Sequence, residues 1–455
     1  MADSGEDRAA HAALRAAWDE MLADLTRARD AIDDPHLYPP PPTERNLADG
    51  YRYLLGFLYG AIERAFGDPR FPSIRRAISP VDKATIDNAD ALYLAAPIDG
   101  NLTYRVTGRA QDHRHWRGDA PAPTGRTAPQ YVIFEATTAW AGDTGQLAEL
   151  SPTVRTNTGT LDSSKLQVGP DGTFEILVAP EAPEGYAGNF IRSKGFVRSA
   201  GMEHTALYLI IRELFHDWER EDALDLQITC VASQGTHPRP LDAEAAAGQI
   251  RRVGEIVDTQ MRFWNEFYAV VLETYGDMNG DGQRFMPRND LNAPNFASIQ
   301  TGGGQTTNLY AGGVFELAAD DALVIEVRVP VPPAYSGFHL SNLWGESLDY
   351  ANHVTSLSAH QAEPDADGAV RFVVAHHDPG VPNWLDTTGL PEGFMALRWT
   401  YPTKPDQLPT VKVTKVPFDA IHQHLPADVC TVSAAQRREQ IRIRQAHVQR
   451  RFRQY

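Results

Sequence analysis

The C-terminal half of the chain consists of short β-prone segments that alternate with turn residues. From Asn308 onward the segments are LYAGGVFEL, ALVIEVRVP, GFHLSNLWG, AVRFVVAH, FMALRWTYP and TVKVTKVP. The turns between them are rich in glycine and proline, of which the chain has 35 and 32. Several short strands with such turns are typical of a β-sandwich or jelly roll. The pattern therefore predicts a jelly-roll-like β domain over residues 301–430.

A second β-rich region precedes it, over residues 91–200, with the segments ALYLAAPI, LTYRVTGRA, QYVIFEATTAW and TFEILVA. Apolar residues at helical spacing predict a helical N-terminal region over 1–90 and a helical insert over 201–300. The insert is expected to contain one helix over 202–221 and a long one over 242–276. Residues 431–455 predict an Arg-rich C-terminal helix. The predicted fold class is mostly β with α, with two β-sandwich or jelly-roll-like regions.

Charge and cysteine content restrict the partners of the chain. It has 42 Lys and Arg against 59 Asp and Glu, a net charge of −17, which disfavours binding to nucleic acid. Its two cysteines match neither a disulfide framework nor a thiolate zinc site. We expect no membrane span, because no run of 18 apolar residues occurs. The N-terminus lacks a signal-peptide pattern, so the expected location is cytoplasmic.

No established catalytic or metal-binding motif is present, and we expect neither a cofactor nor a metal. GxSxG, HExxH, CxxC and Walker sequences are all absent. The stretch DMNGDG places Asp277, Asn279 and Asp281 at the first ligand positions of a calcium loop, but Arg288 stands at the twelfth, where a Glu is required. An ordinary turn explains this stretch better. The pairs His113/His115 and His422/His424 have strand-like HxH spacing, yet surface histidines are the favoured interpretation.

The stretch AHHDPGVPNWLDTTG (375–389) is the strongest candidate site. It follows a predicted buried strand, and its DPGV sequence fits a type II turn. A rigid loop at a strand end suits the presentation of polar groups to a ligand. The predicted catalytic residues are Asp378, Asn383, Asp386, Tyr350, Arg398 and His377. The predicted substrate-binding residues are Trp384, Trp344, Asn342 and Arg212.

Each of these residues also has a structural interpretation. Asp and Asn side chains often bond to turn backbone, and Trp384 suits the edge of a sandwich. On the helix predicted over 202–221, Arg212 and His216 share a face. Arg212 suits a substrate carboxylate or sulfate there, and equally a structural acid such as Asp217 or Glu213.

Three segments together resemble a bacterial family called domain of unknown function 1214. They are LYLIIRELFHDWE, the stretch from LYAGGVFEL to DADG, and VVAHHDPGVPNWLDTTGLPEGFMALRW, of which DPGVPNWLDT is the most specific. The resemblance covers roughly residue 101 to the C-terminus. It implies a mostly-β architecture with a jelly-roll-like C-terminal domain, and it brings no established reaction.

Two functions from different classes follow from this pattern. The first is a cofactor-independent enzyme, a hydrolase, lyase or isomerase that acts on a small apolar, aromatic or sugar-like compound in bacterial catabolism. The alternative is a non-catalytic protein that binds a carbohydrate or an aromatic ligand. In either case the expected partner is a small organic molecule, and assembly into a homo-oligomer is one option. A third interpretation is a structural role, in which the Arg-rich C-terminal segment docks on an acidic sister subunit or packs on its own chain through Ile441, Val448 and Phe452.

Overall fold

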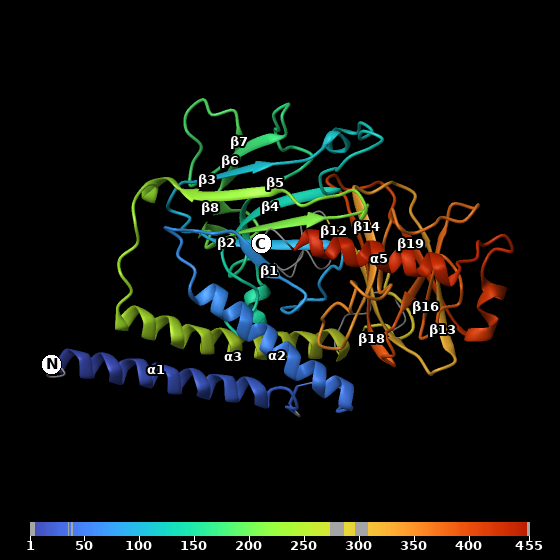
Figure 1. The fold of residues 1–455 in the computed structure, drawn as a ribbon, viewed down its shortest axis with the longest axis horizontal. Coiled ribbons are helices and arrows are strands. Elements are labelled where there is room, and N and C mark those ends of the chain that lie inside the picture. The colour runs from blue at the N-terminus through green and yellow to red at the C-terminus, as the bar shows by residue number, and fades with distance from the viewer. Residues whose placement is uncertain (1–4, 35, 38–39, 274–285, 296–307, 453–455) are drawn as a thin grey trace.

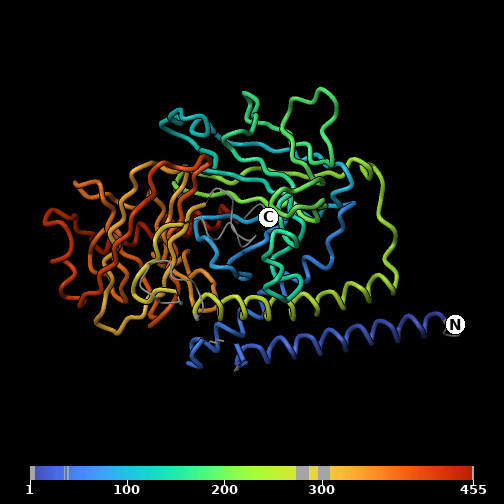
Figure 2. Tube along the Cα trace, turned by 180° about the vertical axis from the view of Figure 1, so that it is seen from behind, coloured from blue at the N-terminus to red at the C-terminus, as the bar shows by residue number. Residues whose placement is uncertain are grey.

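The computed structural model describes residues 5–34, 36–37, 40–273, 286–295 and 308–452. Two β-sandwiches lie side by side, and a layer of helices runs along one side of both (Figures 1 and 2). The prediction of a mostly-β fold with helices at both ends is confirmed. No helix within the described ranges is long and apolar enough to cross a membrane.

The first sandwich contains a five-stranded and a four-stranded sheet. The five-stranded sheet has the order β1 (Arg75–Ile78), β2 (Ala91–Pro97), β10 (Tyr208–Leu214), β4 (Tyr131–Thr137) and β5 (Asn157–Asp162). The four-stranded sheet has the order β11 (Asp225–Cys230), β3 (Tyr104–Arg109), β6 (Thr173–Ala179) and β7 (Asn189–Arg192). A separate hairpin joins β8 (Lys194–Val197) to β9 (Met202–Thr205).

The second sandwich contains two four-stranded sheets. One has the order β12 (Asn308–Glu316), β18 (Glu392–Thr400), β14 (Tyr335–Ser341) and β15 (Ser356–Ser358). The other has the order β17 (Trp384–Asp386), β16 (Val370–Ala375), β13 (Asp321–Arg328) and β19 (Thr410–Pro417). These strands fall within the jelly-roll-like region predicted over 301–430.

Four long helices complete the fold of the described residues. They are α1 (Gly5–Asp30), α2 (Glu44–Ala65), α3 (Ala243–Glu273) and α5 (Ala434–Arg451). Short 3-10 helices lie at η1 (Arg114–Arg117), η2 (Leu147–Leu150), η3 (Val231–Ser233) and η4 (Phe418–His424). The helix α3 contacts both sandwiches, since Gln260 donates to Ala141 O at 2.7 Å and the Tyr268 ring lies 5.7 Å from that of Phe394 in β18.

The prediction of a helix over 202–221 is wrong, because this segment contains the strands β9 and β10. Leu209 and Ile211 point into the sandwich core, and Ile210 and Arg212 point the other way, as strand geometry requires. A strand covered on both faces has an almost continuous apolar sequence, which periodicity alone does not distinguish from a helix. As a result the first sandwich extends to Cys230, and Arg212 and His216 do not share a helix face.

The Arg-rich helix α5 packs on its own chain. Ile441, Val448 and Phe452 contact the two sandwich cores. Arg444 is buried and donates to Tyr350 O at 3.0 Å, and Arg451 donates to Ala89 O at 2.6 Å. Buried guanidinium groups that bond to backbone carbonyls tie the helix to both sandwiches.

Candidate functional site

The loop 375–389 uses its polar groups for internal bonds. Asp378 accepts hydrogen bonds from Gly380 N at 2.9 Å, and from Arg437 Nε and Nη2 of α5 at 2.9 and 3.0 Å. Gly380 has φ of +73°, as a type II turn requires at this position. Asp378 therefore closes the turn and anchors α5.

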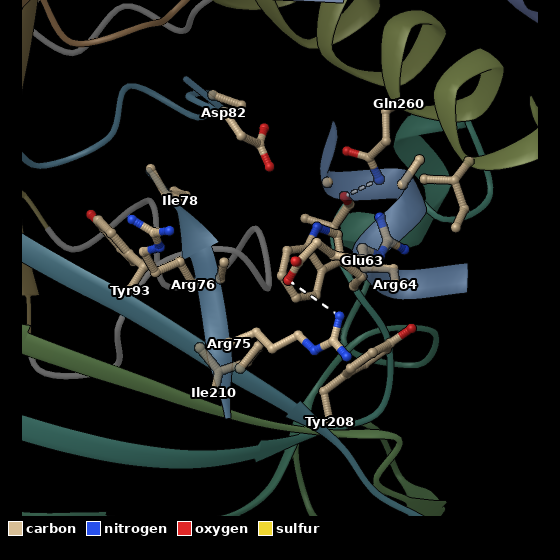
Figure 3. Close-up of a pocket in the computed structure, with 18 of the residues that line it drawn as sticks. Glu63, Arg64, Arg75, Arg76, Ile78, Asp82, Tyr93, Tyr208, Ile210 and Gln260 are labelled. Carbon is tan, nitrogen blue, oxygen red and sulfur yellow. Dashed lines mark hydrogen bonds and ion pairs between the residues drawn. The ribbon is translucent and has the colours of Figure 1, made fainter. Parts of the chain in front are cut away.

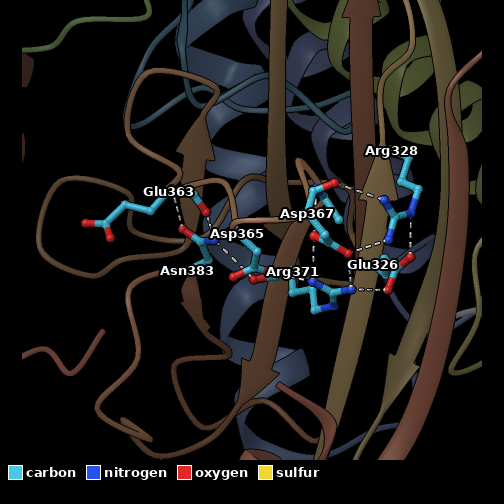
Figure 4. Close-up of polar contacts among 8 residues, drawn as sticks. Glu326, Arg328, Glu363, Asp365, Asp367, Arg371 and Asn383 are labelled. Atoms are coloured by element: carbon cyan, nitrogen blue, oxygen red, sulfur yellow. Dashed lines mark hydrogen bonds and ion pairs between the residues drawn. The ribbon is translucent and has the colours of Figure 1, made fainter. Parts of the chain in front are cut away.

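The other polar residues of this loop are also paired. Asn383 is buried, accepts from Glu363 N at 2.8 Å, and donates to Glu363 O at 2.8 Å and Arg371 O at 3.1 Å (Figure 4). Trp384 donates to Ala375 O at 3.0 Å. Asp386 lies 2.8 Å from His353 Nδ1 and accepts from Thr388 N at 2.7 Å.

Around Asn383, Figure 4 shows a network of charged side chains on the outer surface of β13 and β16. Arg371 pairs with Asp365 at 2.6 Å and with Glu326 at 2.7 Å. Arg328 pairs with Asp367 at 2.6 Å. Each of these two arginines has carboxylate partners, so the network is already neutralised by the chain itself.

Of the other predicted residues, three that lie outside the loop are buried, and His377 within the loop is exposed. Asn342, Trp344 and Tyr350 are buried, and the indole of Trp344 donates to Asn46 O at 2.8 Å. Asn342 Oδ1 accepts from the backbone N–H of Trp344 at 3.1 Å, and the Tyr350 ring packs in the first core. His377 is exposed, and its ring contacts that of Phe418 at 6.1 Å.

Of the ten predicted site residues, Asn342 and Tyr350 line one cavity, near His353 and Thr388. Arg212 and Arg398 line another, whose walls are largely apolar. Arg212 belongs to β10 of the first sandwich and Arg398 to β18 of the second, and both side chains leave the outer faces of their sheets. The cavity lies where these outer faces meet beneath α2 and α3. It has two lobes, of about 170 and 220 Å³, which share Thr85, Tyr93, Arg212 and Trp264 among their lining residues.

The walls of the cavity are largely apolar and aromatic. The first lobe, shown in Figure 3, lies between α2, β1, β2, β10 and α3, and Trp140 and Tyr208 form part of it. The second lobe is lined by Phe267, Met395 and Tyr310. Such walls exclude water from polar groups, which strengthens any electrostatic contact made there.

The two arginines of the cavity differ in how they are paired. Arg212 forms an ion pair with Glu135, whose other oxygen accepts from Asn157 at 2.9 Å. Arg398 is 8% exposed and donates to Ile86 O, and its guanidinium lies 5.6 Å from the Tyr310 ring centre. Within the described part of the chain, Arg398 has no carboxylate partner, and its Nε–H has no acceptor. It is thus a buried cation whose charge no carboxylate among the described residues neutralises.

A carboxyl group that the sequence did not indicate also lines the first lobe. Burial raises the pKa of Asp82 to about 8, and the nearby Arg64 offsets only part of this shift. Gly60 of α2 makes room for it, because a Cβ there would lie 2.3 Å from Asp82 Oδ2. Asp82 is therefore predominantly neutral at pH 7 and is able to exchange a proton near neutrality.

The backbone beside Asp82 has an unusual conformation. Thr85 and Ile86 have φ of +73° and +53°. Positive φ is unfavourable for β-branched residues, and such strain clusters at functional sites. The strained turn directs Ile86 O toward Arg398. Nothing in the sequence SPVDKATID marks this geometry, so sequence reasoning missed it.

The two predicted histidine pairs do not line this cavity. The stretch with Asp277, Asn279 and Asp281 lies outside the described residues. His113 bonds to Gln111 O and His115 to Pro129 O, whereas His422 and His424 belong to η4. In the ranges that the structure describes, no group of three or more His, Cys, Asp or Glu side chains is arranged to hold a metal ion.

Comparison with known proteins gives a fold but no activity. An uncharacterized protein from Burkholderia cenocepacia is 29% identical in sequence, with a TM-score of 0.71, over 90% of this chain and 99% of that one. The VPA0106 protein from Vibrio parahaemolyticus is 13% identical with a TM-score of 0.41, over 86% of this chain and all of that one. No family model and no curated protein matches the chain.

Proposed function

We propose that the cavity between the two sandwiches binds a small, mainly apolar or aromatic compound that carries an anionic group. The observation that supports this most strongly is the unneutralised guanidinium of Arg398. A buried charge without a partner is costly, so an anionic ligand oxygen at this position offsets that cost. Guanidinium groups bind carboxylates particularly well because of their planar array of donors.

The size of the cavity limits the ligand. An apolar cavity of about 150 Å³ holds one benzene molecule. Each lobe therefore suits a group of about one ring, and the ligand is expected to have one or two. Trp140 and Trp264 provide flat surfaces against which such rings can pack.

Within this proposal the protein is an enzyme that uses acid–base chemistry, a hydrolase, lyase or isomerase. Asp82 is the proton-transferring group, because a carboxyl with a pKa of about 8 serves as an acid or a base near neutral pH. Arg398 fixes the anionic end of the compound. The aromatic walls also suit the alternative, a non-catalytic binder of an aromatic or sugar-like ligand, in which Asp82 takes no part in chemistry.

The binding proposal is testable with benzoate as the probe and benzyl alcohol as its neutral analogue. Isothermal titration of the wild-type protein is expected to detect benzoate and to give at least tenfold weaker binding of benzyl alcohol. The variant Arg398→Met should weaken benzoate binding by about tenfold to a hundredfold, because a hydrogen bond to a charged group contributes roughly 1.5–3 kcal/mol.

Arg75→Met is the matched control. Arg75 lines the first lobe, whereas Arg398 lines the second. Arg75 is exposed and lies 3.6 Å from Glu63, so its loss should leave benzoate binding unchanged. Equal binding of benzoate and benzyl alcohol by the wild-type protein would rule out the anion requirement, and this comparison does not depend on whether Arg398→Met folds.

A further inference from the structure

The solvent-facing side of α2 carries an apolar stripe. Its six members have exposed fractions between 36% and 61%, and they are Leu47, Tyr51, Leu55, Tyr59, Ile62 and Phe66. Their spacing of three and four residues places them on one face of the helix. The opposite face, with Tyr53, Phe57 and Ala61, packs in the helical layer. A helix on the surface of a monomer normally turns a polar face to water, and this one does not.

We propose that this stripe is the interface of a homodimer in which α2 packs antiparallel against α2 of a second copy. The stripe is symmetric about a point close to Gly56 and Phe57. A two-fold axis there places Leu47 against Phe66 of the second copy, Tyr51 against Ile62, and Leu55 against Tyr59. An isologous contact requires such self-complementarity, since each surface must match itself after rotation.

Charge at the ends of the stripe fits the same arrangement. Arg45 lies at the N-terminal end and Asp68 follows the C-terminal end, and both are exposed. The antiparallel pairing brings each Arg45 toward Asp68 of the other copy, which adds an attraction at both ends. The net charge of −17, and the balance of three arginines against three acidic residues in α2, favour a second copy over an anionic lipid surface as the occupant.

The exposed area of the stripe is also sufficient for a specific dimer interface. Large side chains have roughly 200 Å² of surface each, so six of them at about half exposure provide on the order of 600 Å² per copy. Two copies together bury about 1,200 Å², which is the lower end for specific interfaces. The dimer is therefore expected to be reversible and to depend on concentration.

The test is sedimentation velocity of the full chain over a range of concentrations. The wild-type protein should shift from monomer to dimer as its concentration increases. Leu55→Glu, which buries a charge beside the axis, should remain monomeric. Leu241→Glu is the matched control, because Leu241 is 66% exposed and lies outside the stripe, and this variant should still dimerise. Melting temperatures of all three verify that they are folded.

Cysteine cross-linking tests the direction of the two helices. In a Cys430→Ser background, which removes the exposed cysteine, Leu47→Cys and Phe66→Cys should not cross-link alone but should do so when mixed. Cross-linking of each variant alone would overturn the antiparallel arrangement. A wild-type monomer at the highest concentration, or a folded Leu55→Glu dimer, would overturn the interface. The interface would also be overturned if the wild-type monomer bound phosphatidylcholine vesicles and Leu55→Glu did not.

Discussion

The loop 375–389 and the wall of the inter-sandwich cavity contain similar residue types but use them differently. In the loop, Asn383 makes three hydrogen bonds with backbone groups, and Asp378 accepts three from Gly380 and Arg437. In the cavity, Arg398 has an Nε–H without an acceptor in the described structure, and Asp82 has a raised pKa.

A structural polar cluster therefore differs from a candidate site less in its residue types than in whether its polar groups have hydrogen-bond or ion-pair partners within the chain. A polar group that is fully paired within the chain has little capacity to bind a ligand, and its main effect is on stability. A buried group with an open position is destabilising until a ligand fills it. We therefore expect substitutions in the loop to reduce stability. Substitutions in the cavity should instead alter ligand binding and the pH dependence of stability.

The largest expected effect is that of Asn383→Ala on stability. The substitution removes three hydrogen bonds with part-buried backbone groups of Glu363 and Arg371, so it should lower the free energy of unfolding by about 3 kcal/mol. Urea denaturation measures this loss, and titration of the folded variant should give unchanged benzoate binding. A variant with wild-type stability that no longer binds benzoate would instead place Asn383 in the functional site.

Between pH 7 and 8, a smaller effect is expected for Asp82→Asn, and it depends on pH. The pKa of Asp82 is about 8 in the folded protein and about 3.9 when unfolded, so the folded state holds the proton more tightly. The stability that this proton provides is present at low pH and is lost as the pH rises toward 8. Relative to that of Asp82→Asn, the free energy of unfolding of the wild-type protein should therefore decrease by about 1 kcal/mol between pH 7 and 8.

Above pH 8 to 9, Asp82 is ionised in both the folded and the unfolded state. The difference in free energy of unfolding between the wild-type protein and Asp82→Asn should therefore become constant. Urea denaturation at each pH measures it. Glu213 and Glu221, whose pKa values burial raises to about 8, are present in both proteins, so their contributions cancel. A difference that stays constant from pH 5 to 9 would contradict the raised pKa of Asp82.

The sequence predicted much of the fold because periodicity reports on local structure. Helices α1, α2, α3 and α5 and most strands of both sandwiches lie in regions where apolar spacing or turn residues indicated them, whereas β1 and β10 lie in regions predicted to be helical. The failure at β10 arose because both faces of that strand are covered, so its sequence has no alternation. Arg212 was named as a possible ligand for an anion, but its structural partner proved to be Glu135 and not one of the acids near it in sequence.

The cavity was beyond sequence reasoning for a different reason. It is formed by Asp82, Tyr93, Arg212 and Arg398, which lie in a turn and on three strands from both sandwiches. No local pattern reports how two sheets meet, and none marks the strained backbone at Thr85 and Ile86. In contrast, the turn at Asp378 is encoded by three adjacent residues, and it was predicted.

The smallest expected effect is that of His377→Ala. His377 was predicted as a catalytic base, but its ring is exposed and its one described contact is an edge-on packing with Phe418. Surface substitutions of this kind change stability by less than about 0.5 kcal/mol, and the residue does not line the cavity. We therefore expect both the urea midpoint and the benzoate affinity of the variant to equal those of the wild-type protein. If the affinity fell tenfold while the midpoint stayed constant, the ligand would have to bind at the loop, and the distinction between the two regions would be reversed.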